Sequence, residues 1–344
     1  MGGTSAERDV SLASGLRVAA ALRSLGHQVT AIDTVRGALT EGDERAMTER
    51  GVMRTLPPER DVLARMSAEA LPATVRAIPS PADVDVVFLG LHGGQGEDGT
   101  IQALLDLTGV PYTGSGHLAS ALAMDKDLSK RLFREAGVPT PDWQMVHRAD
   151  DPETRRTHGF AVAAVAALGL PVIVKPSKQG STVGLTLVKA ADELAPAIAE
   201  AFRYDDEVML ERFVPGRELT VGILGDTALP VGEIIPKHEI YDYECKYTAG
   251  MAREVFPADI TGEQRSDIQE LALRAFRALK LAGYARIDFR MTKEGTFYCL
   301  EANTLPGMTE LSLIPQAAAA AGIGFSDLCD KIVSLALRLP VSGD

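Results

Sequence analysis

The sequence GYARIDFRMTKEGTFYCLEANTLPGMTE, residues 283–310, carries the clearest structural signal in the chain. Two runs that alternate between apolar and polar residues flank a short polar segment, a pattern that indicates a β-hairpin. With Glu294 and Gly295 at the tip of the turn, two polar pairs face each other across the hairpin. These pairs are Asp288 with Glu301 and Arg286 with Asn303.

The predicted hairpin has one polar and one apolar face, because the side chains of a strand alternate between faces. The four residues of the two polar pairs share one face. The other face is predicted to carry Ile287, Phe289, Met291, Tyr298 and Leu300.

Two carboxylates that face each other repel unless a cation or a proton lies between them. Asp288, Glu301 and Asn303 offer only oxygen ligands, which suit a hard ion such as Mg²⁺. The alternative is a surface hairpin whose carboxylates pair with Arg286 and Arg290. The spacing alone leaves both interpretations open.

Composition places the chain among ordinary globular proteins. It has 344 residues, 46% of them apolar and 24% charged, enough for two or three domains. The net charge of −12 argues against nucleic acid as a partner, because phosphate neutralisation requires a basic surface.

The cysteine pattern and the apolar stretches predict a cytoplasmic protein without a membrane segment. Three widely spaced cysteines form neither a disulfide framework nor a CxxC metal site. The longest apolar stretch, residues 160–174, contains Gly169 and Pro171 and is too short to span a bilayer. Met1 does not lead into an apolar signal core.

The order of predicted elements is typical of an α/β protein. Residues 84–91 form an apolar run that predicts a buried parallel strand. A helix is predicted over residues 121–137, and another over 160–169. A Thr261/Gln264 capping box predicts the start of a third helix, which extends to Leu281.

Residues 172–184, VIVKPSKQGSTVG, read as a strand followed by a glycine-containing loop. Lys175 leaves the strand, and the loop around Gly180, Ser181 and Thr182 can present backbone N–H groups to phosphate. The chain has no Gly-Lys-Ser/Thr sequence, so a Walker A loop is excluded. The alternative is a polar hairpin with an exposed lysine.

Residues 94–99, GQGEDG, match the GxGxxG pattern of dinucleotide sites. Such a site also needs an acidic residue about 20 positions later, at the end of the next strand. The next predicted strand is residues 110–113, which contains a proline and ends without an acid. A nicotinamide dehydrogenase is therefore disfavoured, and His92 remains open to a structural role.

Thr4 and Glu7 form a T-x-x-E pattern ahead of an apolar helix, which is typical of a capping box. Without further information, the sequence favours a capping role for Glu7 over a functional one.

Taken together, seven segments in this order resemble the D-alanine–D-alanine ligase family of the ATP-grasp superfamily. They are GGTSAERDVSLASG (2–15), LHGGQGEDGTIQALLDLTGVPYTGSG (91–116), SALAMDKDLSK (120–130), PVIVKPSKQGSTVG (171–184), YDYECKY (241–247), ARIDF (285–289) and LEANTLPGMTELSLIP (300–315).

The resemblance implies a three-domain ATP-grasp fold, α/β with an α+β C-terminal part. It implies a Rossmann-like substrate-binding domain at 1–115, a central ATP-grasp subdomain at 116–207 and a C-terminal subdomain with the metal site at 208–344. The family has a short apolar strand directly before GGTSAE, where this chain has Met1. We therefore expect the first domain to lack that strand and the natural start to lie upstream.

The implied reaction joins two D-alanines for peptidoglycan synthesis. ATP first phosphorylates the carboxylate of one D-alanine, and the amine of the second then attacks the acyl phosphate. Two Mg²⁺ ions, or Mn²⁺ in their place, are implied as cofactors on Asp288, Glu301 and Asn303.

The resemblance also implies a role for each motif residue around ATP. Lys126 and Lys175 would neutralise the phosphates beneath the loop of Gly180, Ser181 and Thr182. Adenine and ribose would be held by Glu211, Phe213, Val214 and Glu218.

The remaining roles concern the two D-alanines. Glu7, with His92 nearby, would bind the first ammonium, and Arg286 with the Gly307 N–H would stabilise the oxyanion. Ser181 and Tyr247 would form a hydrogen-bonded triad with Glu7. Lys246 would reach the transferring phosphate, and Ser312 with Leu313 would bind the second substrate.

Two other functional hypotheses remain open at this stage. One is a related ligase that joins D-alanine to another amino or hydroxy acid, such as D-serine or D-lactate. The other is an ATP-binding relative that has lost catalysis. The resemblance further implies a homodimer that acts on small molecules.

Overall fold

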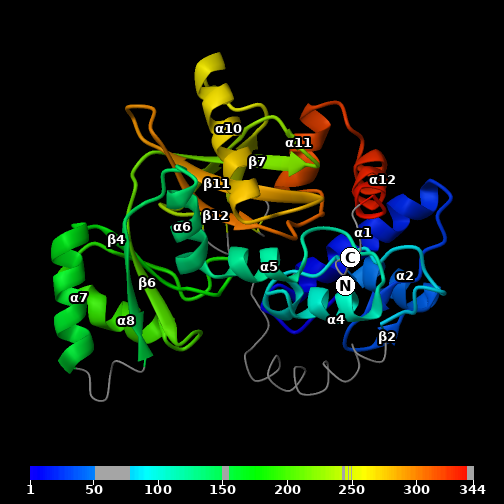
Figure 1. Ribbon diagram of the computed structural model, residues 1–344, viewed down its shortest axis with the longest axis horizontal. Helices are drawn as coiled ribbons and strands as arrows, with labels where there is room; N and C mark the ends of the chain where they lie inside the picture. Colours follow the sequence, from blue (N-terminus) through cyan, green and yellow to red (C-terminus); the bar gives the residue numbers. More distant parts are fainter. Residues whose placement is uncertain (51–77, 149–154, 242–244, 247, 249, 339–344) are drawn as a thin grey trace.

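The computed structural model describes residues 1–50, 78–148, 155–241, 245–246, 248 and 250–338. The described elements form three groups, each built around its own strands or helices (Figure 1). None of the helices in these ranges is both long and apolar enough to cross a bilayer.

The largest sheet is antiparallel and has the strand order β10-β9-β7-β11-β12, with β8 attached to β7. Helix α10 (Gly262–Ala278) packs on one face, and its predicted capping box is confirmed. Ile268 and Phe276 of α10 join Ile287 and Phe289 of the sheet in one buried core. The strands are β7 (Arg217–Leu224), β8 (Thr227–Ala228), β9 (Gly232–Pro236), β10 (Ala252–Val255), β11 (Tyr284–Met291) and β12 (Phe297–Asn303).

The predicted hairpin is β11–β12, and its register is confirmed at the functional end. Asp288 pairs with Glu301 and Arg286 with Asn303. Nearer the turn the prediction is wrong by one residue, because a β-bulge follows Asp288 and leaves Leu300 as the extra residue of β12.

The bulge also corrects the predicted apolar face. Cys299 and Phe297 join Ile287, Phe289 and Met291 in the core. Tyr298 lies 5.5 Å from the guanidinium of Arg212, and Leu300 lines a cavity. The two residues assigned to the core by strict alternation therefore lie on the opposite face.

The second sheet has the strand order β3-β6-β4-β5 and is covered by α7 (Arg155–Leu168) and α8 (Leu194–Ala201) (Figure 1). A 3₁₀ turn, Ala191–Glu193, leads into α8. The strands are β3 (Trp143–His147), β4 (Val172–Pro176), β5 (Thr186–Val188) and β6 (Glu207–Arg212). The predicted strand and following glycine-containing loop at 172–184 are thus confirmed.

The helix predicted over 121–137 is in fact two helices, α5 (His117–Met124) and α6 (Lys126–Glu135). Asp125 separates them in an extended conformation, and its carboxylate accepts a hydrogen bond from the Leu128 N–H. This side-chain cap defines the start of α6. It is more favourable than a single helix that continues from α5 through Asp125.

The N-terminal group contains α1 (Arg8–Ser24), which packs against α12 (Phe325–Ala336) (Figure 1). Residues 84–91 do not form the predicted strand: Val87 makes one parallel bridge with Tyr112, and residues 84–88 are not buried. A cavity borders this segment. The other elements are β1 (Ile32–Asp33), β2 (Gly37–Ala38), α2 (Glu41–Arg50), η1 (Gly94–Gly96), α4 (Thr100–Thr108) and α11 (Leu313–Ala320).

The loop before α1 is fixed by a buried ion pair. Arg8 donates to both carboxylate oxygens of Asp33, at 3.0 and 2.5 Å, and also to the carbonyl of Gly3 at 2.8 Å. Asp33 is fully buried and Arg8 nearly so. Met1 extends this contact by hydrogen bonds to Ile32 O and from Thr34 N.

Replacing Asp33 by alanine would leave the Arg8 guanidinium buried without its counter-charge. We expect the free energy of unfolding to fall by about 3 kcal/mol, measured by urea denaturation. The matched control is Asp330→Ala, which removes an exposed contact with His27 and should cost less than about 1 kcal/mol. Equal losses in both variants would contradict this assignment.

Candidate active site

Two cavities adjoin at the meeting point of the three groups of elements. The inter-sheet cavity is lined by residues of both sheets. The N-terminal cavity lies between the loop before α1, the segment after β12 and the start of α11. Five residues line both cavities and form a shared wall: Gly180, Ser181, Tyr241, Lys246 and Arg286.

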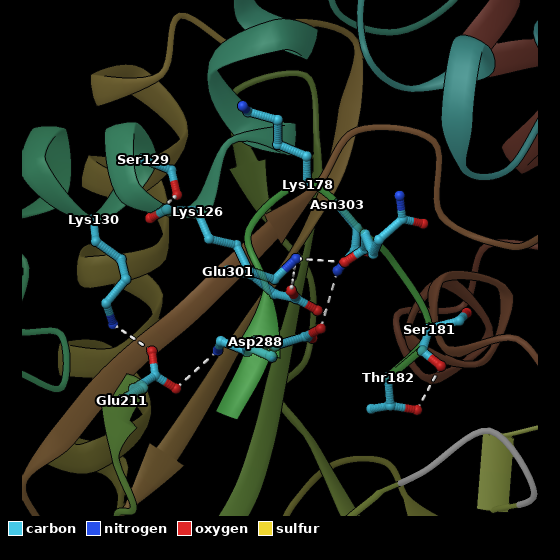
Figure 2. A network of polar contacts seen from close by, with 12 residues as sticks. Lys126, Ser129, Lys130, Lys178, Ser181, Thr182, Glu211, Asp288, Glu301 and Asn303 are labelled. Carbon is cyan, nitrogen blue, oxygen red and sulfur yellow. Dashed lines mark hydrogen bonds and ion pairs between the residues drawn. The ribbon is translucent and has the colours of Figure 1, made fainter. Parts of the chain in front are cut away.

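Glu211 lies at the back of the inter-sheet cavity between two lysines (Figure 2). Its carboxylate accepts from Lys130 Nζ at 2.6 Å and from Lys175 Nζ at 2.8 Å. Burial alone would raise the pKa of Glu211, but the two ammonium groups hold this pKa below its usual value. Burial lowers the pKa of Lys130 to about 8, against the opposing effect of Glu211.

Lys126, at the start of α6, lies beside Glu301 of β12 (Figure 2). Its Nζ donates to the carbonyl of Gln179 at 2.7 Å and lies 3.3 Å from Glu301 Oε2. Burial opposes the charge of Glu301, but Lys126, Lys246, Lys175 and Arg286 together lower its pKa to about 2. Glu301 is therefore a carboxylate at every physiological pH.

Asp288 is held by three neighbours on the polar face of the sheet. Arg286 Nε and Nη2 donate to it at 2.9 Å each, and Thr220 Oγ1 and Asn303 Nδ2 donate at 2.7 and 3.0 Å. The Arg286–Asp288 pair is the one that the surface-hairpin alternative predicted. Its location between two cavities, however, contradicts a surface hairpin.

The outer part of the inter-sheet cavity contains Glu218, Phe213 and Val214. Arg290 donates to Glu218 at 3.1 Å and to the carbonyl of Val214 at 3.0 Å. The Phe213 N–H donates to Pro171 O. Burial raises the pKa of Glu218 despite the nearby Arg290 charge.

The loop after β4 reaches across to the N-terminal group. Ser181 and Thr182 both adopt left-handed conformations, with φ of 49° and 59°. The Ser181 hydroxyl donates to Glu7 Oε1. Glu7 occupies the N-cap of α1, but its side chain makes no capping bond, so the capping-box interpretation is wrong.

His92 lines the N-terminal cavity with both ring nitrogens hydrogen-bonded. Nδ1 lies 2.7 Å from Leu305 O, and Nε2 lies 3.0 Å from Ser14 Oγ. Burial lowers the pKa of His92, so the ring is neutral at pH 7.

The other end of this cavity is formed by Gly307, Ser312 and Leu313. Ser312 is the N-cap of α11, and its hydroxyl accepts from the Thr309 N–H at 2.9 Å. A helix N-terminus with its donors facing a cavity favours an anionic group.

Sequence reasoning missed several residues that line these cavities or contact their lining. Lys130 and Tyr241 lie within quoted motifs, four residues after Lys126 and at the start of YDYECKY. Helical spacing places Lys130 one turn beyond Lys126, a signal that could have been used. Glu97 lies in the rejected GxGxxG segment and also lines the N-terminal cavity. Tyr247, predicted as part of the triad, lies outside the described residues.

The residues proposed for metal binding were tested against their surroundings. Asp288 and Glu301 are adjacent carboxylates, each already beside a protein cation, and Asn303 adds an amide. Within the described ranges, no cluster of three His, Cys, Asp or Glu side chains is arranged as metal ligands. The all-oxygen set nevertheless fits a hard cation that completes the charge balance.

Comparisons with known proteins agree on one family. Models described as "D-ala D-ala ligase N-terminus" and "D-ala D-ala ligase C-terminus" match residues 1–115 and 132–334. The chain belongs to the D-alanine–D-alanine ligase family. A ligase of that name from Geotalea uraniireducens is 43% identical over 98% of this chain and 94% of its own. That from Aquifex aeolicus is 40% identical over 97% and 98%.

Solved structures of the same family share this fold, which is an ATP-grasp fold. The Bacillus anthracis D-alanine–D-alanine ligase is 33% identical and has a TM-score of 0.75, over 98% of this chain and 96% of its own. The same enzyme complexed with ATP is 32% identical, with a TM-score of 0.73 over 98% and 95%. This family membership agrees with the resemblance found in the motifs.

Replacing Lys130 by methionine would remove one of the two lysines that the described structure places on the buried Glu211 carboxylate and would leave the Lys175 contact. We expect the free energy of unfolding to fall by about 1.5–3 kcal/mol, measured by urea denaturation at pH 7. The control is Lys178→Met, whose Nζ forms a largely exposed contact with Glu207 at 2.8 Å. It should lose less than about 1 kcal/mol. A Lys130→Met protein as stable as the control would show that the pair contributes little.

Proposed function

We propose that the two cavities are the nucleotide and amino-acid sites of an ATP-dependent ligase that joins two D-alanines. The observation that carries this proposal is the shared wall, in which Arg286 and Lys246 face both cavities. A phosphoryl group passing from one site to the other must cross such a wall, where fixed positive charge stabilises it. The family's enzymes provide independent support.

ATP binds in the inter-sheet cavity. Lys126 and Lys175 neutralise its phosphates, and the backbone of Gly180–Thr182 covers them. The Glu211 carboxylate, held rigid by Lys130, accepts from the exocyclic amine of adenine, while Glu218 accepts from the ribose hydroxyls. Phe213 and Val214 lie beside the adenine base. They provide backbone polar groups and apolar surface for it.

Asp288, Glu301 and Asn303 would hold the Mg²⁺ ions, or Mn²⁺ in their place. When bound, these ions neutralise charge on the phosphates and on the transferring phosphoryl group. In the structure Lys126 and Arg286 occupy the charge-balancing positions beside these carboxylates.

The first D-alanine binds with its ammonium at Glu7 and its carboxylate at Arg286 and the Gly307 N–H. A carboxylate oxygen attacks the γ-phosphorus, the O–P bond forms, and ADP leaves. The Lys246 ammonium contacts the phosphoryl group while it is transferred. Arg286 and Gly307 then stabilise the acyl phosphate and the oxyanion that follows.

The second D-alanine binds with its carboxylate at Ser312 and at the N-terminus of α11, beside Leu313. Its amine, after losing a proton to solvent, attacks the acyl carbon. The C–N bond forms and the nitrogen gives up its extra proton to the departing phosphate or to solvent. The C–O bond to phosphate breaks, and inorganic phosphate leaves. His92 orients the surrounding loop through its bonds to Leu305 and Ser14.

We further propose domain boundaries at residues 115 and 207, a homodimeric state and a cytoplasmic location; the first boundary agrees with the end of the N-terminal family match. We also propose a triad in which Tyr247 joins Ser181 and Glu7. Contact between Ser181 and Glu7 brings the central loop onto the N-terminal group, and closure of this kind excludes water from an acyl phosphate.

The decisive experiment measures ADP release with Mg²⁺ and ATP. We expect release with D-alanine alone, together with the dipeptide by mass spectrometry, and loss of both in EDTA. Glu301→Gln should lower the rate by a factor on the order of 100 or more. Release only when D-serine or D-lactate accompanies D-alanine would assign a different second substrate. No release from a folded, ATP-binding protein would refute the proposal.

Gly307→Ala offers a local test of the second-substrate site. A Cβ at Gly307 would lie 2.7 Å from Ser312 Oγ, so the hydroxyl must move. We expect the KM of the second D-alanine to rise on the order of tenfold while the KM of ATP stays unchanged. Gly262→Ala serves as the control, because a Cβ there meets nothing within 4 Å. An equal rise in the KM of ATP would instead indicate a general disturbance.

A further inference from the structure

We propose that Glu97 is a second carboxyl group of the ammonium-binding end of the N-terminal cavity, acting with Glu7 on the first D-alanine. This inference rests on the proposed function and adds to it a residue for which no role has been assigned. Glu97 follows η1 and lines the cavity together with Glu7 and His92.

The two carboxyl groups converge on the same backbone residue. The Gly93 N–H donates to Glu97 Oε2 at 3.1 Å. On the other side of this residue, a Cβ built on Gly93 would lie 2.8 Å from Glu7 Oε2. Gly93 has a φ of 67°, which a glycine adopts without strain. A glycine at this position therefore lets both carboxyl groups approach from their separate segments.

The charges around Glu97 indicate a binding site for a cation. Burial raises the pKa of Glu97 to about 8, and the Glu7 charge and the more distant Glu301 add to the effect. Arg286 opposes it, but this guanidinium is already engaged by Asp288. His92 is neutral and bonded at both nitrogens, so it does not compensate the pair.

The polarity of the whole cavity matches a zwitterionic amino acid. Glu7 and Glu97 supply carboxyl groups at one end, and Arg286, Lys246 and the start of α11 form the basic end. An α-ammonium between the two carboxyl groups favours the charged form of both. Binding of D-alanine should therefore convert the Glu97 carboxylic acid to a carboxylate and release its proton to solvent.

This proton release is a readout that a structural role for Glu97 would not produce. We would titrate D-alanine in the presence of ADP, without turnover, by calorimetry in two buffers of different ionisation enthalpy at pH 7.5. The expected result is net proton release from the wild-type protein and little or none from Glu97→Gln. Absence of release from the wild-type protein would overturn the proposal without any variant.

Steady-state kinetics give the second test. In Glu97→Gln we expect the KM of the first D-alanine to rise on the order of tenfold, because one of two charges facing the ammonium is lost. The KM of ATP should stay unchanged. The control is Glu263→Gln, an exposed carboxyl group on α10 that should change neither value. An unchanged KM for the first D-alanine in Glu97→Gln would overturn the inference and leave the ligase function intact.

Unfolding of the free protein separates a binding defect from a folding defect. A carboxyl group whose pKa is raised on folding makes the native state lose stability as pH rises from about 4.5 to about 8. Glu97→Gln removes this penalty, so its stability relative to wild type should increase from pH 5 to pH 8. A variant equally destabilised at both pH values would assign Glu97 a packing role and overturn the inference.

Discussion

The arrangement depends on balancing charges that have been removed from water. An isolated buried carboxylate or ammonium costs several kcal/mol, so each such group needs a partner of opposite sign. In the inter-sheet cavity, Glu211 lies between Lys130 and Lys175, and Glu301 lies beside Lys126. These pairs connect α6 to both sheets, and so the same contacts that hold the sheets together also form the walls of the cavity.

The N-terminal cavity is balanced less completely, and this difference has chemical meaning. Its positive end already has protein partners, since Arg286 is bound by Asp288. Its negative end has two carboxyl groups and a neutral histidine. In the inter-sheet cavity the protein's own side chains balance one another's charges. Such a site suits a ligand that arrives with its own counter-ions, as a nucleotide with metal does. The N-terminal cavity has acidic groups at one end and basic groups at the other, which suits a zwitterionic ligand.

Sequence reasoning succeeded where a short-range rule determined the outcome. Strand alternation correctly placed Arg286 and Asp288 opposite Asn303 and Glu301, and the capping box correctly started α10. It failed where one local signal competed with another, or with a distant contact. Asp125 interrupts a continuous helical pattern, and Glu7 follows a capping pattern but bonds to Ser181, a residue 174 positions away.

Because of the β-bulge in β12, the strand pairing near Asp288 does not depend on the pairing near the turn of the hairpin. Along β11, all eight pairs with β7, from Tyr284 to Met291, are continuous, whereas the pairing with β12 shifts by one residue after Asp288. The position of Asp288 is thus set by the neighbouring strand and not by the length of the loop at 292–296. Residues can be gained or lost at that tip during evolution while the catalytic end stays in register, which makes it a natural place for relatives to diverge.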